Sequence, residues 1–293
     1  MKPIVWTLPS DQRSTFIPLG CLHWPIGEKD LLQKWVRAVQ EAENGWTLLM
    51  GDTCDVARTH YRKHLKSYLN DENSQLALDE WHKREVVALA KVLEPIKHRI
   101  AGAILGNHYW EYSDGINSEQ FLCQLLGIPY LGPAGVIRIE YREKKGKGDV
   151  RGTHVLFAHH DGGSSGGRTM GGDINALTRV EQNIDADIFV LSHTHKKYAI
   201  KLPQLALTSK GTPRLRERPR VMIRSGCLLK GYKEDHPSPT QPHFPTYAEK
   251  AAYRPTALGW VTCFVDWEKK HRRIPGSRKH VHTDYIPEFT LSF

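Results

Sequence analysis

Hydrophobic and polar positions along the first two thirds of the chain follow two different periods. Short apolar runs predict buried strands, and longer segments with apolar residues three and four positions apart predict helices. The expected strands cover residues 16–20, 46–50, 99–105, 130, 136–140, 155–158 and 187–191. The expected helices cover residues 28–44, two segments within 58–97 that break near 70–73, 118–126 and 174–184. This alternation is typical of an α/β protein.

The last third of the chain is richer in strand-like sequence. Apolar runs at 198–207, 221–224 and 260–265 predict further strands, and 143–151 reads as a charged hairpin tip that contains glycine. The Pro-rich segment 235–243 is too short for an interdomain linker. We therefore expect one domain, residues 1–293, with a two-sheet β-sandwich flanked by helices.

Composition narrows the class of protein. The chain has 293 residues, of which 40% are hydrophobic and 25% charged, as in ordinary globular proteins. Its net charge of +9 favours anionic partners. The five cysteines are odd in number, have no CxxC spacing and follow no secretory signal, which predicts reduced thiols in a cytoplasmic protein. No apolar run is long enough to suggest a membrane span.

Five short patches, each directly after a predicted strand, contain side chains that can bind metal ions. They occupy residues 19–24, 51–55, 106–109, 158–161 and 192–195. Together they supply carboxylate, imidazole, amide and thiolate groups at strand ends, where an open α/β sheet collects its functional residues. The pattern predicts two metal ions side by side, and hence metal-assisted attack on a phosphate ester.

Three of the patches also have a simpler interpretation. His193 and His195 could be a solvated surface pair, and Asp52 with Asp55 could be a helix cap and a turn. Residues 106–108 could be turn chemistry alone. None of these interpretations explains the ordered series of five.

In this order the patches resemble the calcineurin-like metallophosphoesterase superfamily, whose pattern runs D-x-H, G-D-x-x-D, G-N-H-D/E, a strand ending in His, and G-H-x-H. The resemblance covers residues 16–195. Residues 225–260 and the Gly-rich stretch after His159 further resemble uncharacterised members from bacteriophages and prophages. The chain departs from the pattern at three positions, where Cys21 replaces the first Asp, Tyr109 replaces the acidic residue and Ser192 replaces the last Gly.

The resemblance implies a ligand set for each metal ion. The first ion would be held by Cys21, His23, Asp52 and His195, and the second by Asp52, Asn107, His159 and His193. Asp52 would bridge the two ions, which lower the pKa of a bound water and generate hydroxide. His108 would stabilise the developing charge or protonate the leaving oxygen, and Asp55 would orient an imidazole or a water.

Cys21 bears on the choice of metal. A thiolate carries the same charge as the missing carboxylate but is softer, so it favours zinc or iron over magnesium or manganese. We therefore expect two divalent ions, zinc, iron or manganese, with Cys21 favouring the first two. If Cys21 does not bind, one ion is weakly held or absent.

Two assignments after the strand at 155–158 stay open. His159 lies nearest the strand end and is the preferred ligand, and His160 would then contact substrate or solvent. The Gly-rich segment 161–172 is either a flexible connector or a mobile flap whose Arg168 reaches a phosphate. It lacks the terminal Gly-Lys-Ser/Thr of a P-loop.

The expected function is metal-dependent hydrolysis of phosphate esters, with phosphodiesters preferred. One alternative is a nuclease acting on DNA or RNA. In that case the basic stretches 210–220 and 269–279 would follow the backbone of the nucleic acid. Another is a catalytically degenerate protein that binds a metal or nucleotide, made inert by Cys21. The sequence leaves the physiological substrate and the oligomeric state open.

Overall fold

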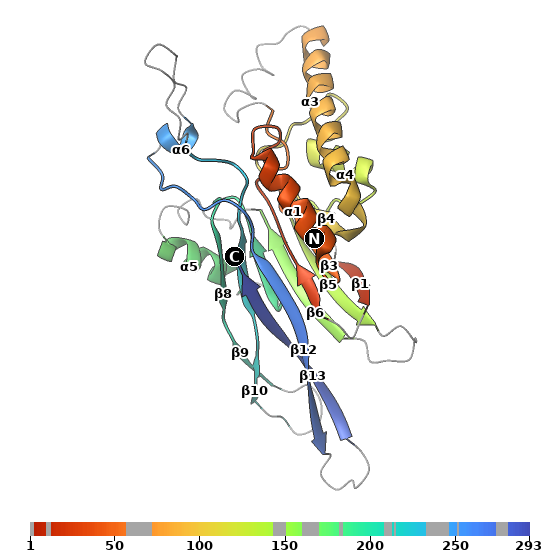
Figure 1. Cartoon of the computed structure of the whole chain (residues 1–293), viewed down its shortest axis with the longest axis vertical. Helices are drawn as coiled ribbons and strands as arrows, with labels where there is room; N and C mark the ends of the chain where they lie inside the picture. The colour runs from red at the N-terminus through yellow and green to blue at the C-terminus, as the bar shows by residue number, and fades with distance from the viewer. Residues whose placement is uncertain are drawn as a thin grey trace.

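The computed structural model describes residues 3–9, 13–56, 72–142, 151–159, 170–181, 184–207, 213, 215–232, 246–250, 252–273 and 281–293. It confirms the predicted fold class, because two β-sheets face each other and helices cover both outer faces (Figure 1). The grouping of all 293 residues in one domain stays a prediction.

The larger sheet has six strands in the order β1-β5-β6-β7-β11-β8. Strands β6, β7 and β11 run parallel, whereas β5 and β8 run antiparallel to their neighbours β6 and β11. The strands span Ile4–Pro9 (β1), Ala134–Arg142 (β5), Arg151–Ala158 (β6), Ile188–Leu191 (β7), Val221–Ser225 (β11) and Lys197–Lys201 (β8).

The second sheet has five strands in the order β13-β12-β2-β3-β4. Strands β2, β3 and β4 run parallel, and β12 pairs antiparallel with both β2 and β13. The strands span Val281–Ser292 (β13), Thr262–Arg273 (β12), Ser14–Phe16 (β2), Gly45–Leu49 (β3) and Ile100–Ala103 (β4). A separate two-stranded ribbon joins β9 (Gln204–Leu207) to β10 (Leu215–Arg218).

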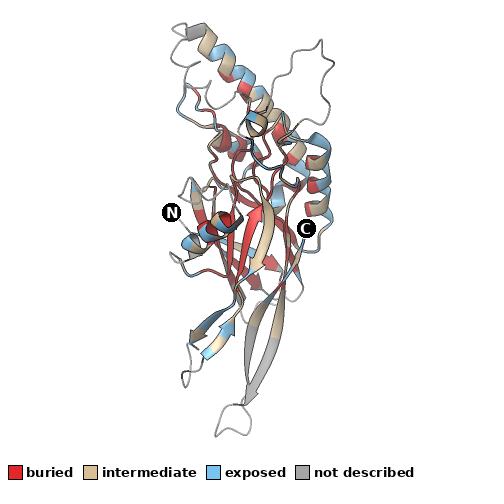
Figure 2. Ribbon diagram, turned by 90° about the vertical axis from the view of Figure 1, so that its left-hand side faces the viewer, coloured by how far each residue is buried: buried red, intermediate tan, exposed pale blue. Residues whose placement is uncertain are grey.

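The main core lies between the two sheets and appears as red strands at the centre of Figure 2. Phe16 stacks on Trp46 from the five-stranded sheet with ring centroids 3.9 Å apart, and the cluster continues to Phe157 of the other sheet. A second cluster joins the outer face of the five-stranded sheet to three α-helices and one 3₁₀ helix, and a third joins the six-stranded sheet to one α-helix. The helices span Lys29–Glu41 (α1), Glu72–Leu93 (α3), Glu94–Arg99 (η1, a 3₁₀ helix), Ser118–Leu126 (α4), Met170–Glu181 (α5) and Tyr247–Lys250 (α6).

Local sequence accounts for the helix boundaries. In α1 the buried residues Leu32, Trp35, Val36 and Val39 form one stripe at helical spacing, as predicted. Helix α4 begins after a capping box at Asn117 and ends at Gly127, so its predicted bounds of 118–126 are confirmed.

The structure differs from the predicted elements in the later part of the chain. The expected strand at 198–207 is two strands, β8 and β9, because Pro203 lies between them. Helix α5 begins at Met170, so the last three residues of the predicted Gly-rich loop are helical. Strand β1 near the N-terminus and strands β10 and β13 were not predicted, and β12 is longer than expected. The hairpin tip at 143–150, the Pro-rich segment 235–243 and the first helix expected within 58–71 lie outside the described residues.

Among the described residues, no helix is both long enough and apolar enough to cross a lipid bilayer. All five cysteines are buried free thiols.

Candidate metal centre

Five parallel strands end at the same edge of the two facing sheets. The residues after β2, β3 and β4 come from one sheet, and those after β6 and β7 come from the other. The carboxyl ends of parallel strands meet at one edge, so these segments converge. They carry the predicted ligands Cys21, His23, Asp52, Asn107, His159, His193 and His195.

Five of these seven residues have left-handed backbone conformations. The φ angles are 52° at Cys21, 49° at His23, 51° at Asp52, 70° at His193 and 59° at His195. Such a conformation costs an L-residue about 1–2 kcal/mol relative to a right-handed one. Residues with such strained backbone conformations typically cluster at functional sites, where the surrounding structure holds them in place.

Asp52 lies at the centre of the cluster and is almost fully buried. Its Oδ1 accepts a hydrogen bond of 2.7 Å from the backbone N–H of His108. Its Oδ2 lies 3.1 Å from Nε2 of His159 and 4.0 Å from Nε2 of His23. Burial opposes ionisation, but the hydrogen bond and positive charge of His159 outweigh it and lower the pKa of Asp52 well below its usual range. Asp52 is therefore a carboxylate positioned between two sets of imidazoles. The first set is His159 with His193, and the second is His23 with His195.

The first set of neighbours surrounds the amide oxygen of Asn107. This Oδ1 lies 3.0 Å from Nε2 of His159 and 2.9 Å from Nδ1 of His193. His159 donates from Nδ1 to the carbonyl oxygen of Met50 at 2.7 Å, which fixes the tautomer that leaves an Nε2 lone pair in the neutral ring. That lone pair would face the Asp52 carboxylate, so a proton or a cation is needed between them. Consistent with this need, the Asp52 contact outweighs burial and raises the pKa of His159 in the metal-free protein.

The second set brings two imidazole nitrogens face to face. Nε2 of His23 lies 3.1 Å from Nε2 of His195, and Nδ1 of His23 donates to Oδ2 of Asp55 at 3.2 Å. Burial and the neighbouring His23 lower the pKa of His195 to about 3, which keeps this ring neutral. Both nitrogens are within reach of one ion at the usual zinc–nitrogen distance of about 2.0–2.1 Å.

Cys21 lies between the two sets. Its sulfur is within 4.8 Å of ligand atoms of His23 and His195, and also of ligand atoms of Asp52 and His159. Burial and the charge of Asp52 raise the pKa of the thiol well above its usual value, so a cation would have to displace its proton. Ser192 hydrogen-bonds Cys21 with an Oγ–Sγ distance of 3.3 Å.

Asp55 and His108 form a polar pair at the border of the cluster. Nδ1 of His108 lies 2.9 Å from Oδ2 of Asp55, the same oxygen that receives His23. These hydrogen bonds outweigh burial and hold the pKa of Asp55 well below its usual range. One carboxylate therefore orients two imidazoles.

The close approach of β3 and β4 requires a glycine. A Cβ atom at Gly106 would lie 2.0 Å from Oδ1 of Asp52 and 2.1 Å from its backbone nitrogen. No side chain fits there without displacing Asp52, so Gly106 has a steric role in the cluster.

A buried ion pair that sequence reasoning missed supports the loop of His193. Arg224 on β11 donates to Asp173 on α5 at 2.7 Å and to the carbonyl oxygen of Ser192 at 3.0 Å. Tyr198 donates to the other oxygen of Asp173 at 2.6 Å. The two ionic partners are 51 positions apart in the sequence, and no local pattern connects them.

The described ligand atoms fit a cation in both sets. Paired nitrogens, a carboxylate, an amide oxygen and a thiol converge, and the hydrogen bonds of Asp55 and Met50 fix the imidazole tautomers that bind metal. Two predicted substrate contacts, His160 and Arg168, lie outside the described residues. The structure thus brings together all seven predicted ligands with Asp55 and His108.

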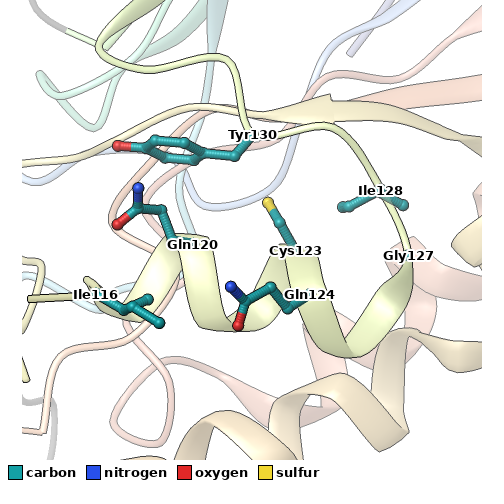
Figure 3. Close-up of a pocket in the computed structure, with 7 residues that line it drawn as sticks. All are labelled: Ile116, Gln120, Cys123, Gln124, Gly127, Ile128 and Tyr130. Carbon is teal, nitrogen blue, oxygen red and sulfur yellow. The ribbon is translucent and has the colours of Figure 1, made fainter. Parts of the chain in front are cut away.

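A separate hollow of about 400 Å³ lies beside α4 (Figure 3). Its lining includes Gln120, Cys123, Ile128 and Tyr130, and none of the predicted ligands takes part. This hollow is distinct from the cluster of candidate ligands.

A scan against models of known protein families finds no match, and no curated protein matches the sequence. Several solved structures align with this chain over most of its length. Vps29 from Chaetomium thermophilum has 11% identity and a TM-score of 0.35, with 94% of this chain and 95% of that chain covered. Vps29 from Entamoeba histolytica, complexed with Zn²⁺, has 13% identity and a TM-score of 0.37, with 93% and 98% covered.

A further similar structure is a conserved uncharacterised protein from Streptococcus pneumoniae, described as a predicted phosphoesterase. It has 11% identity and a TM-score of 0.31, with 97% of this chain and 100% of that chain covered. At such low identity, function has to be inferred from the chain's own residues.

Proposed function

We propose that this chain is a metal-dependent phosphoric ester hydrolase of the calcineurin-like metallophosphoesterase superfamily, acting on phosphodiesters. The observation that supports this most directly is the placement of Asp52, whose carboxylate lies between the imidazoles of His23 and His159. Cys21, His23, Asp52 and His195 would hold one divalent ion, and Asp52, Asn107, His159 and His193 would hold the other. When bound, such a pair supplies Lewis-acid activation of the nucleophile and charge neutralisation at the phosphate.

The chain's own residues supply proton transfer and orientation. Nδ1–H of His108 donates to Asp55, so Nε2 is the atom that would exchange a proton with the leaving oxygen. Asp55 also holds His23 through Nδ1, which directs Nε2 of that ring toward the ion. One side of the site is buried and consists of Cys21, His23, Asp52 and His159. The other side is partly exposed and consists of Asn107, His108, His193 and His195, so substrate would approach from this side.

The test is hydrolysis of an aryl phosphodiester and an aryl phosphomonoester by metal-stripped protein reconstituted with zinc, iron, manganese or magnesium. We expect metal-dependent turnover that is faster on the diester. Asp52→Asn should abolish it, and His108→Ala should lower kcat by about 10²–10⁴-fold while metal content stays unchanged. Faster turnover of the monoester would contradict the diester preference, and metal-independent turnover would contradict the mechanism.

Substitutions of Cys21 distinguish this proposal from the alternative hypothesis of a catalytically degenerate binding protein. If Cys21 is a ligand, Cys21→Ala should weaken the binding of one of two zinc ions, and Cys21→Asp should shift the preferred metal from zinc toward manganese. An inactive parent protein that gains turnover as Cys21→Asp would instead support the degenerate reading.

A further inference from the structure

Helix α3 contacts the rest of the protein in two different ways along its length. Its C-terminal half is held by apolar residues of the second core cluster, Val86, Leu89, Ala90 and Leu93. Within residues 74–85 of its N-terminal half, the two buried side chains that the structure describes are polar, Asp79 and His82. Hydrogen bonds are directional, whereas hydrophobic burial is not, so this half of α3 can fix the orientation of the segments that it contacts.

Asp79 binds the loop that carries His108. Trp110 lies two residues after His108 and donates from Nε1 to Oδ1 of Asp79 at 2.7 Å. Ser113 donates to Oδ2 of the same carboxylate, from its backbone N–H at 2.8 Å and from its hydroxyl at 2.7 Å. The ring of His82 stacks on Trp110 with ring centroids 5.5 Å apart. The loop after β4 is therefore attached to α3 through three hydrogen bonds to one side chain.

Glu85 binds the loop that carries His23. Trp24 directly follows His23 and donates from Nε1 to Oε2 of Glu85 at 3.0 Å. The backbone carbonyl of Trp24 also accepts a hydrogen bond of 2.8 Å from the N–H of Asp55. Glu85 lies six positions after Asp79, which corresponds to about 9 Å along a helix. One rigid helix thus holds the loops after β2 and β4 at a fixed separation.

The two loops meet again inside the candidate metal centre. Oδ2 of Asp55 accepts from Nδ1 of His23 at 3.2 Å and lies 2.9 Å from Nδ1 of His108. The two imidazoles pack edge-on with ring centroids 4.8 Å apart. Their relative position therefore depends on Asp55 inside the site and on Asp79 and Glu85 outside it.

We infer that Asp79 and Glu85 are positioning residues, which hold the loops of His108 and His23 so that Nδ1 of each ring meets Asp55 and Nε2 is directed into the metal centre. The inference rests on the proposed function, in which His108 transfers a proton and His23 binds an ion. A displacement of ~1 Å caused by a remote substitution can cost about 100-fold in rate, so attachment of these loops matters for the chemistry. A merely structural role for the same contacts would change stability and leave both imidazoles as they are.

The test compares substitutions that remove the acceptor with substitutions that keep it. Asp79→Ala and Glu85→Ala remove it, whereas Asp79→Asn and Glu85→Gln keep an amide oxygen that can accept from the indole N–H. The matched control is Glu80→Ala, which removes an exposed carboxylate from the same helix. Circular dichroism checks folding, and Trp110→Phe, which keeps the ring and removes the donor, replaces Asp79→Ala if that variant does not fold.

The first measurement is made on the metal-free protein, by long-range ¹H–¹⁵N NMR of the histidine rings. We expect His23 and His108 of the wild type to carry their proton on Nδ1. Asp79→Ala should shift His108 toward the Nε2–H tautomer, and Glu85→Ala should do the same for His23. The amide variants and Glu80→Ala should retain the wild-type tautomers.

The second measurement uses zinc. Glu85→Ala should weaken zinc binding, measured by calorimetry, by about 10–100-fold, because His23 is a proposed ligand. Asp79→Ala should lower kcat for a phenyl phosphodiester by about 10–100-fold while KM and zinc content stay within about twofold. The loss should be smaller for a 4-nitrophenyl diester, because 4-nitrophenolate leaves without needing a proton from His108.

The inference is overturned if the alanine variants match Glu80→Ala in tautomers, zinc affinity and kcat. It is also overturned if the amide variants lose as much as the alanine variants, since the acceptor would then not be the cause. A wild-type protein that shows the expected tautomers and zinc affinities but no turnover would contradict the proposed hydrolase activity and support the positioning role.

Discussion

The ion pair of Arg224 and Asp173 gives the most direct test of how the ligand loops are supported. Arg224 is 1% exposed and Asp173 is 0% exposed, and Arg224 also donates to the carbonyl oxygen of Ser192, next to His193. Replacing Arg224 by Met keeps the apolar stem but leaves the Asp173 carboxylate without its guanidinium. Breaking a buried pair from one side costs about 3–5 kcal/mol.

The assay is urea unfolding of the metal-free protein. With a slope of about 3 kcal/mol per molar urea, a loss of ~3–5 kcal/mol moves the midpoint down by roughly 1–1.7 M. Because Ser192 adjoins a proposed ligand, zinc affinity should also fall by about 10–100-fold. The exposed pair of Arg13 and Asp266 is the control, and Arg13→Met should cost under ~1 kcal/mol.

A double substitution isolates the pair itself. Combining Arg224→Met with Asp173→Asn removes both charges, so the double variant should be less destabilised than the sum of the two single variants by about 1–3 kcal/mol. The reasoning is refuted if Arg224→Met costs less than about 1 kcal/mol, or if the two single effects simply add.

Two further predictions concern buried positions near the cluster. Gly106→Ala should abolish zinc binding and diester hydrolysis, because its Cβ would overlap Asp52, whereas Gly171→Ala on α5 meets no atom within 4 Å and should leave both unchanged. Burial raises the pKa of Glu119 to about 7 from 4.5, so the folded state binds the extra proton and stability falls as the pH rises between these values. Glu119→Gln should therefore be more stable than the wild type by about 3 kcal/mol at pH 8 and nearly equal to it at pH 4.5, measured by urea unfolding; an equal difference at both pH values would contradict this assignment.

Local signals were sufficient for the elements that position the cluster. The stripe of Leu32, Trp35 and Val39 predicts α1, and the helix expected at 118–126 coincides with α4. The candidate ligands could be selected because each follows an apolar strand, and the topology brings the ends of parallel strands together.

Features that depend on distant partners could not be predicted in the same way. Helix α5 begins at Met170 although two glycines follow, and Asp173 in its first turn is paired with Arg224 on β11. The expected strand at 260–265 covers only the start of β12, because a charged run follows from Glu268 to Arg273, and β13 was missed although Tyr285, Phe289 and Leu291 occupy alternate positions. Tertiary pairing overrides local propensity in both places.

The backbone is left-handed at Cys21, His23, Asp52, His193 and His195. At each of these candidate ligand positions, the direction of the side chain is set by the backbone and not by the type of side chain. Packing of the strand ends sets the backbone angle, and that angle aims the Cα–Cβ bond whichever side chain follows. A carboxylate and a thiolate can therefore exchange at position 21 without rebuilding the loop. A scaffold of this kind can be retuned between hard and soft cations by single substitutions, which makes it a starting point for designed metal specificity.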